Sequence, residues 1–281
     1  MIWVGCIMVN SIRDRLDESD TVSEITLILN HDKNKVCVIV EGKDDQILFR
    51  PLFARNVEVF ESYASNTGVD GVVQNYFKGR KRVIGIRDRD YLSVPINDQC
   101  FFCDYCCAEM MIIAIDSCFD RLYCNFYHTG SMNSEELRLY CLERLEKLSK
   151  LRKLNATLNW RIRFDGIKPS KCYKKSIIKM NDEIVEALNK MNSSNIIDSY
   201  RESVCDALPK CKSLPEYLSI TNGHDFINLF CEVSTNSHGQ ASIKSIEATL
   251  RGSFGISDFK KTRLFNELLT YQRKKGIIIV S

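Results

Sequence analysis

Three short apolar segments, each rich in β-branched residues, alternate with helical patterns in the first third of the chain. Val36–Val40 is continuously apolar, which predicts a strand buried on both faces of a sheet. Further strands are predicted at 57–60 and 82–86. Strands that alternate with helices of about ten residues form βαβ units and a mainly parallel sheet. The alternation therefore predicts an α/β fold.

The pattern changes in the second half of the chain. A fourth strand is predicted at 100–103 and a helix at 108–115, after which a long amphipathic helix is expected at 135–154. The sequence beyond it is mostly helical in pattern, except at 159–167, where apolar residues alternate with arginines as in a strand with one basic face. The predicted helix at 135–154 carries a stripe of leucines: Leu137, Leu142, Leu145, Leu148 and Leu151.

The composition bounds the class of protein. Hydrophobic residues make up 44% and charged residues 27% of 281 residues, as in a globular protein rather than a disordered one. Thirteen cysteines without a secretory signal predict reduced thiols in a cytoplasmic protein. No apolar run reaches the ~18 residues of a membrane span, so no membrane association is expected.

Acidic side chains follow two of the predicted strands. Glu41 comes directly after the first strand, and Asp88 and Asp90 follow the third. Because ligands bind outside the carboxyl ends of parallel strands, we expect the three carboxylates to face one crevice. If the backbone stays extended, Asp88 and Asp90 point to the same side and can hold one hard cation such as Mg²⁺. The alternative for each segment alone is an acidic helix start or a polar turn.

Two of these segments, Val38–Asp45 and Val83–Asp90, resemble the Toprim domain of topoisomerases, primases and overcoming-lysogenization-defect nucleases. More closely, the chain resembles the small standalone Toprim nucleases that act as effectors in bacterial anti-phage defence, including the effector of the PARIS system. The remaining similar segments are Asp104 with Glu109, Asn222–Asp225, Leu250–Arg251 and Phe259–Thr262.

The resemblance implies a fold, a site and an activity. It implies a Toprim-like domain at 1–130, with a mainly parallel sheet flanked by helices, and a mostly helical, basic region at 131–281. It also implies a Mg²⁺-dependent endonuclease, with Mn²⁺ as a second candidate metal. The implied catalytic residues and metal ligands are Glu41, Asp88 and Asp90. Glu109 is either a fourth metal ligand or an acidic residue that is favourable at a helix start.

The same resemblance implies a biological setting. The nuclease would be a toxic effector of anti-phage defence that cleaves tRNA or other RNA, with DNA as a further candidate substrate. It would be activated through an ABC-type ATPase partner and would be a homodimer when active. Two alternatives stay open: a Toprim-like module that docks on an ATPase or nucleic acid without cleaving, and nucleotidyl transfer of the primase kind.

Basic residues strongly outnumber acidic ones between Arg144 and Lys179, with Trp160, Phe164 and Tyr173 among them. Such a stretch suits a nucleic-acid backbone and stacking on unpaired bases. The alternatives are a solvated helix face or the docking surface of an acidic partner. The residues predicted to contact phosphate or substrate are Lys43, Arg89, Arg161, Arg163, Lys171, Lys174 and Lys175.

Cysteines and one histidine offer weaker patterns. The spacing of Cys100, Cys103, Cys106 and Cys107 is compatible with zinc or an iron–sulfur cluster. It is equally typical of small hydrophobic residues on a buried strand, which is the interpretation we favour. His224 lies beside Asp225 at a predicted helix start, where capping or packing is a commoner role than catalysis.

Overall fold

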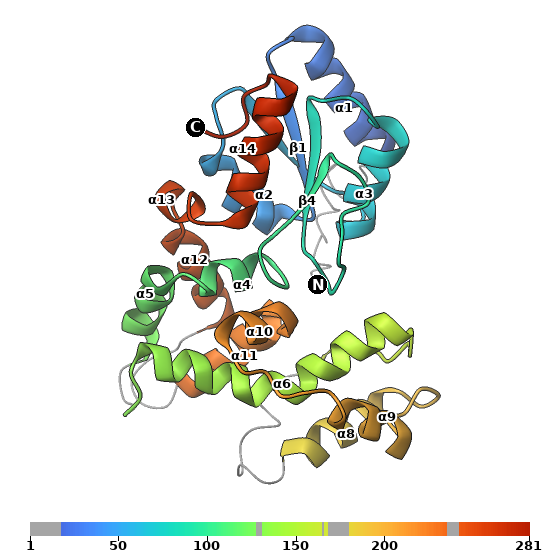
Figure 1. Ribbon diagram of the computed structural model, residues 1–281, viewed down its shortest axis with the longest axis vertical. Helices are drawn as coiled ribbons and strands as arrows, with labels where there is room; N and C mark the ends of the chain where they lie inside the picture. Colours follow the sequence, from blue (N-terminus) through green and yellow to red (C-terminus); the bar gives the residue numbers. More distant parts are fainter. Residues whose placement is uncertain (1–17, 128–130, 165, 168–179, 235–241) are drawn as a thin grey trace, which may run out of the picture. The chain divides into compact units, whose positions relative to one another are not determined.

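The computed structural model describes residues 18–127, 131–164, 166–167, 180–234 and 242–281 (Figure 1). The chain forms two compact units. The sheet unit comprises Met1–Arg87, Pro95–Phe101 and Glu267–Ser281, and the helical unit comprises Asp88–Val94 and Phe102–Asn266. This division differs from the predicted boundary at residue 130, because the chain passes between the units several times.

Four parallel strands form the sheet, in the order β2-β1-β3-β4. β1 lies in the middle and pairs in register with both neighbours, so that Val38 is opposite Val59 of β2 and Ile84 of β3. Every residue of β1 and β3 is buried, which confirms the two-sided burial predicted for β1. The strands are β1 (Val36–Val40), β2 (Val57–Glu61), β3 (Val83–Arg87) and β4 (Cys100–Phe102).

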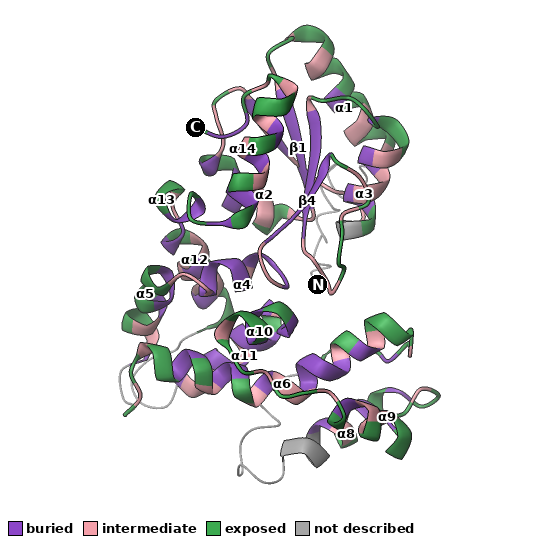
Figure 2. Cartoon of the chain, viewed as in Figure 1, coloured by how far each residue is buried: buried purple, intermediate pink, exposed green. Residues whose placement is uncertain are grey.

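Helices cover both faces of the sheet (Figure 1). On one face, Ile25 of α1 and Val69, Val72 and Val73 of α3 pack with Cys37 and Ile39 of β1 in a buried cluster. On the other face lie α2 and the part of α14 that belongs to the sheet unit. Figure 2 shows the strands as the most continuously buried part of the sheet unit. The bounds are α1 (Glu18–His31), α2 (Lys43–Phe49), η2 (Arg50–Leu52), α3 (Ser65–Tyr76) and α14 (Arg263–Lys275).

The helical unit confirms the predicted helical C-terminal region. Its longest helix, α6, buries all five leucines of the predicted stripe. Phe119 of α5 packs edge to face against Phe226 and Phe230 of α11, with ring centroids 6.1 and 5.9 Å apart. The bounds are α4 (Ala108–Ile113), α5 (Asp116–Phe126), α6 (Ser134–Leu158), α8 (Met180–Met191), α9 (Ser199–Asp206), α10 (Leu214–Ile220), α11 (Gly223–Ser234), α12 (Ile243–Ser253) and α13 (Ile256–Phe259).

The strand predicted at 159–167 is wrong, because the described residues of that segment form no strand. Asparagine side chains supply the hydrogen bonds that a neighbouring strand would have made. The Asn155 amide accepts from the Ile162 N–H (2.8 Å) and donates to the Ile162 carbonyl (3.1 Å). The Asn192 amide likewise accepts from the Arg163 N–H (2.7 Å) and donates to the Arg163 carbonyl (2.9 Å).

None of the helices among the described residues is both long enough and apolar enough to cross a membrane.

Gly85 in β3 gives a test of how closely α3 packs on the sheet. A Cβ at this position would lie 2.7 Å from Val69 Cγ1 and 3.3 Å from Val73 Cγ2. Gly85→Ala should therefore lower the free energy of unfolding by about 1–3 kcal/mol, the usual effect of overpacking. The matched control is Gly252→Ala in α12, where an added Cβ would meet nothing within 4 Å. A urea titration in which both variants unfold at the wild-type midpoint would contradict the packing.

Candidate metal centre

Asp88 is fixed by the backbone at the start of α4. Its Oδ1 accepts a hydrogen bond from the N–H of Ala108, the first residue of that helix, at 2.9 Å. The backbone N–H groups of Arg89 and Asp90 both donate to the carbonyl of Cys106, at 3.1 and 3.2 Å. The loop after β3 is therefore attached to the residues that lead into α4.

This attachment gathers donor atoms suited to a metal ion. Asp88, Cys107 and Glu109 each offer one such atom, and these atoms lie within 4.8 Å of one another. Both carboxylates are half-buried and the thiol is buried. Across the described ranges, this is the one group of three or more His, Cys, Asp or Glu donors that meets these limits. The structure thus brings together two of the four predicted ligands, Asp88 and Glu109.

The donor set fits a divalent cation in chemistry and nearly in spacing. Carboxylate oxygens are the ligands that Mg²⁺ prefers, and it needs only one or two of them when water and phosphate oxygens complete the set. Two oxygens bound to one Mg²⁺ lie at most about 4.2 Å apart, twice the metal–oxygen bond length. The donor atoms of this group lie within 4.8 Å of one another, slightly more than that limit.

Glu109 lies in the first turn of α4, so its charge is also favourable for the helix. A second contact limits where it can move. A Cβ placed on Gly223, the first residue of α11, would lie 2.5 Å from Glu109 Oε2 and 2.8 Å from its Cβ. Only glycine fits beside Glu109 there. Gly223 belongs to the segment Asn222–Asp225, one of those that carry the resemblance. The contact with Glu109 explains why this position is a glycine.

Cys107 joins the two carboxylates, although the sequence favoured a packing role for the cysteines of the 100–107 run. Its hydrogen bond with Cys106, its burial and the nearby charges of Glu109 and Asp88 all raise the pKa of its thiol. The four cysteines of the 100–107 run are free and buried. Burial also raises the pKa of Cys100 to about 12, as expected for a packed thiol. Cys107 alone among the four joins the metal-donor group.

The other two predicted ligands, Asp90 and Glu41, are not part of this donor group. The backbone at Asp90 has φ 45°, so the extended geometry that would point Asp88 and Asp90 to one side is absent. Glu41 belongs to the sheet unit, directly after β1. Its Oε1 lies 3.9 Å from Nε of Arg87, a buried arginine that also pairs with Asp70. A metal-binding role for Asp90 and Glu41 stays a prediction.

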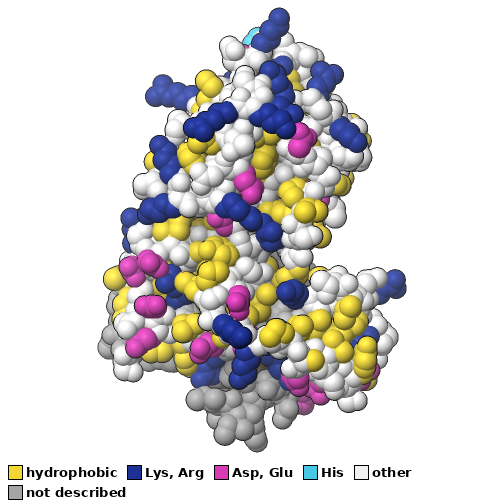
Figure 3. All heavy atoms as spheres, viewed as in Figure 1, with side chains coloured by type: hydrophobic (Ala, Val, Ile, Leu, Met, Phe, Trp, Pro, Cys, Tyr) yellow, Lys and Arg dark blue, Asp and Glu magenta, His cyan; other side chains and the backbone are white. Residues whose placement is uncertain are grey.

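The predicted phosphate contacts are partly described. Lys43, at the start of α2, is exposed, as are Arg161 and Arg163 beyond α6. Arg89 is half-buried, with its guanidinium 5.1 Å from the centroid of the Phe102 ring. On the face drawn in Figure 3, lysines and arginines are spread out rather than gathered into one patch. The three remaining candidates lie outside the described residues: Lys171, Lys174 and Lys175.

Two further acidic residues from the sequence have structural partners. Asp225 is buried and binds Arg152 through two hydrogen bonds, at 2.7 and 2.9 Å. Burial raises the pKa of Asp225, and the Arg152 charge opposes that rise. The carboxylate of Asp104 accepts from the first two N–H groups of α14, where it caps the helix. His224 is exposed, with Nδ1 3.8 Å from Glu247.

A search with models of known protein families found no match to the chain, and a search of curated proteins found none either.

The contact between Gly223 and Glu109 predicts a sensitive position. Gly223→Ala should lower the free energy of unfolding by about 1–3 kcal/mol, because the new methyl group overlaps Glu109. The loss should shrink, but not vanish, when the same change is made in a Glu109→Ala background, since the overlapping Cδ and Oε2 atoms are then gone while the Cβ at 2.8 Å remains. Urea titrations of the four proteins give this coupling directly, and equal losses in both backgrounds would contradict the contact.

Proposed function

We propose that this protein is a metal-dependent phosphodiesterase that cleaves nucleic acid. The observation that carries the proposal is the half-buried pair of carboxylates, Asp88 and Glu109, whose oxygens belong to one donor group at the start of α4. Of the two, Asp88 directly follows β3 in the chain, and the carboxyl ends of parallel strands are where such folds place their ligand sites. Hydrolysis of phosphodiesters is the chemistry that a site of this kind, filled by a divalent cation, most directly supports.

Asp88 and Glu109 would hold the cation, with Mg²⁺ as the first candidate and Mn²⁺ as the second. When bound, such an ion supplies an activated water and stabilises negative charge on phosphoryl oxygens. The protein contributes by holding the two carboxylates in place. Asp88 is held by the Ala108 N–H, and Glu109 is confined by Gly223. Arg89, whose guanidinium lies over Phe102, is suited to bind the phosphate that is to be cleaved.

The resemblance supplies the rest of the proposed function. It supports a Toprim-like nuclease of the cytoplasm that acts on tRNA or other RNA in anti-phage defence. It also supports control by an ABC-type ATPase and a homodimeric active form. The roles of Glu41 and Asp90 as further catalytic carboxylates belong to the same proposal.

Metal binding can be measured without any substrate. Mg²⁺ or Mn²⁺ at about 100 times its dissociation constant should raise the free energy of unfolding by about 2.7 kcal/mol, which a thermal melt detects. Asp88→Asn should abolish the increase and keep the fold, because its side-chain oxygen still accepts from Ala108. Glu109→Gln should act in the same way. The matched control is Glu135→Gln, an exposed acidic residue in the first turn of α6, which should behave as wild type.

Cleavage is tested with end-labelled tRNA, single-stranded RNA and DNA, with Mg²⁺, Mn²⁺ or EDTA. We expect metal-dependent cleavage that falls by more than about 100-fold in Asp88→Asn, since each 1.4 kcal/mol of lost charge stabilisation costs about a factor of ten. Cleavage in EDTA, or full activity in Asp88→Asn, would refute the proposal. Metal binding without cleavage, even with an ATPase partner present, would favour the non-cleaving docking module.

Glu41 requires a separate variant because it also pairs with Arg87. Glu41→Gln should abolish cleavage and leave the unfolding midpoint nearly unchanged, since Arg87 keeps Asp70 as a partner. The informative comparison is Asp70→Asn, which removes the other partner of the same arginine. Activity that falls equally in both variants would assign Glu41 to the support of Arg87 rather than to the metal.

A further inference from the structure

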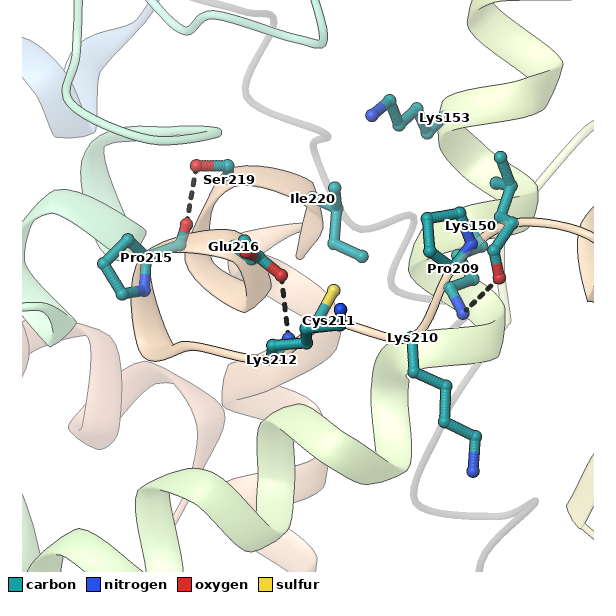
Figure 4. A pocket seen from close by; sticks show the side chains of 11 residues that line it. Lys150, Lys153, Pro209, Lys210, Cys211, Lys212, Pro215, Glu216, Ser219 and Ile220 are labelled. Atoms are coloured by element: carbon teal, nitrogen blue, oxygen red, sulfur yellow. Dashed lines mark hydrogen bonds between the residues drawn. The ribbon is translucent and has the colours of Figure 1, made fainter.

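A pocket of about 530 Å³ lies in the helical unit, between α6 and the segment from Leu208 to Ile220 (Figure 4). Its wall carries four lysines and one carboxylate, that of Glu216. Its apolar lining includes Leu208, Pro209, Pro215 and Ile220, together with Cys211. In Figure 4, Cys211 extends from the loop before α10, and Ile220 lies at the end of that helix. The lysines are Lys150, Lys153, Lys210 and Lys212.

The pocket is held open by interactions of the protein itself. Oε1 of Glu146, on α6, accepts from the Cys211 N–H at 2.8 Å and pairs with Lys150 Nζ at 2.9 Å. Lys150 Nζ also lies 3.4 Å from the carbonyl of Leu208. One buried lysine and one glutamate thus fix the loop to the helix. The pocket is therefore preformed, as ligand pockets usually are.

The remaining charges on the wall favour an anion. Lys153, Lys210 and Lys212 are exposed, and Glu216 already accepts a hydrogen bond from the Lys212 backbone N–H at 2.7 Å. Lysine ammonium groups are hydrated point charges that suit phosphate. The aliphatic lining suits a flat apolar group, and pockets of about 300–1,000 Å³ hold ligands of nucleotide size. A bare anion would leave the aliphatic lining uncovered.

We propose that this pocket binds a nucleoside phosphate, with the base against Ile220 and Pro209 and the phosphate near Lys153 and Lys212. The ligand has two sources with the same chemistry. One is a nucleotide of the nucleic-acid substrate, in which case the inference rests on the proposed function. The other is a free nucleotide, which would bind whether or not the protein cleaves anything. The pocket itself is separate from the carboxylate pair, with which it shares no residue.

Cys211 reports on occupancy because it lines the pocket. Alkylation of the full chain by N-ethylmaleimide is followed by mass spectrometry, in EDTA so that no cleavage occurs. Adenosine monophosphate or a short single-stranded RNA should slow alkylation of Cys211 at least about fivefold at saturation. The exposed Cys124 is the internal control and should not change. Because burial raises the pKa of Cys211, the reaction is run at mildly alkaline pH, where more of the thiolate is present.

Two double variants test the lysines. Lys153→Ala with Lys212→Ala should weaken protection by adenosine monophosphate about tenfold, a loss of about 1.4 kcal/mol. Lys190→Ala with Lys244→Ala removes the same charge from exposed positions on α8 and α12, and protection should be unchanged. Asp88→Asn should also keep full protection, so that loss of the metal centre and loss of the pocket are told apart.

The outcomes separate the two sources. Protection by adenosine monophosphate assigns a free nucleotide, and protection by RNA alone assigns the nucleic-acid substrate. The proposal is overturned if neither ligand protects Cys211 at millimolar concentration, or if inorganic phosphate protects it equally well. It is also overturned if the Lys153/Lys212 variant binds as wild type does. A failed cleavage assay with intact protection would refute only the nuclease.

Discussion

The burial of β1 and β3 on both faces is the constraint on which the rest of the sheet unit depends. Strands with no exposed face must be apolar along their length and covered by helices on both sides, as α1 and α3 do with Ile25, Val69 and Val72 on one face. The one charge on these strands is Arg87, which is 6% exposed and pairs with Asp70 and Glu41. Along β1 and β3, carboxylates can therefore appear only where the strands end, as Glu41 and Asp88 do.

In the helical unit, two local restraints place Glu109. The Asp88 carboxylate holds the N–H of Ala108 at the start of α4, and Gly223 lets the start of α11 approach the glutamate closely. The start of α11 is itself fixed by the buried ion pair of Asp225 with Arg152 of α6. A glutamate restrained by two helix starts loses little freedom when it binds a ligand, which is the usual purpose of preorganisation.

Periodicity explains what could be predicted from the sequence. β1 and β3 are continuous apolar runs, and the stripe on α6 repeats at helical spacing, so both were found with nearly correct bounds. Asp88 could be predicted because it directly follows such a strand. The joining of Asp88 with Glu109 was expected only from the resemblance, and the addition of Cys107 was not expected. No local pattern predicts this group, because it depends on a turn with positive φ at Asp90 and on the attachment of the loop to Cys106. The alternation around Ile162 was misleading, since asparagine side chains replaced the expected strand partner.

Those asparagines decide how the arginine-bearing segment can meet other molecules. At Ile162 and Arg163 the N–H and the carbonyl are both already bonded to a side-chain amide, that of Asn155 and that of Asn192. A peptide or strand that docks by main-chain pairing needs such groups unoccupied. Because the Ile162 side chain is buried, recognition at these two residues must pass through the exposed side chain of Arg163. A second strand cannot pair with the main chain there.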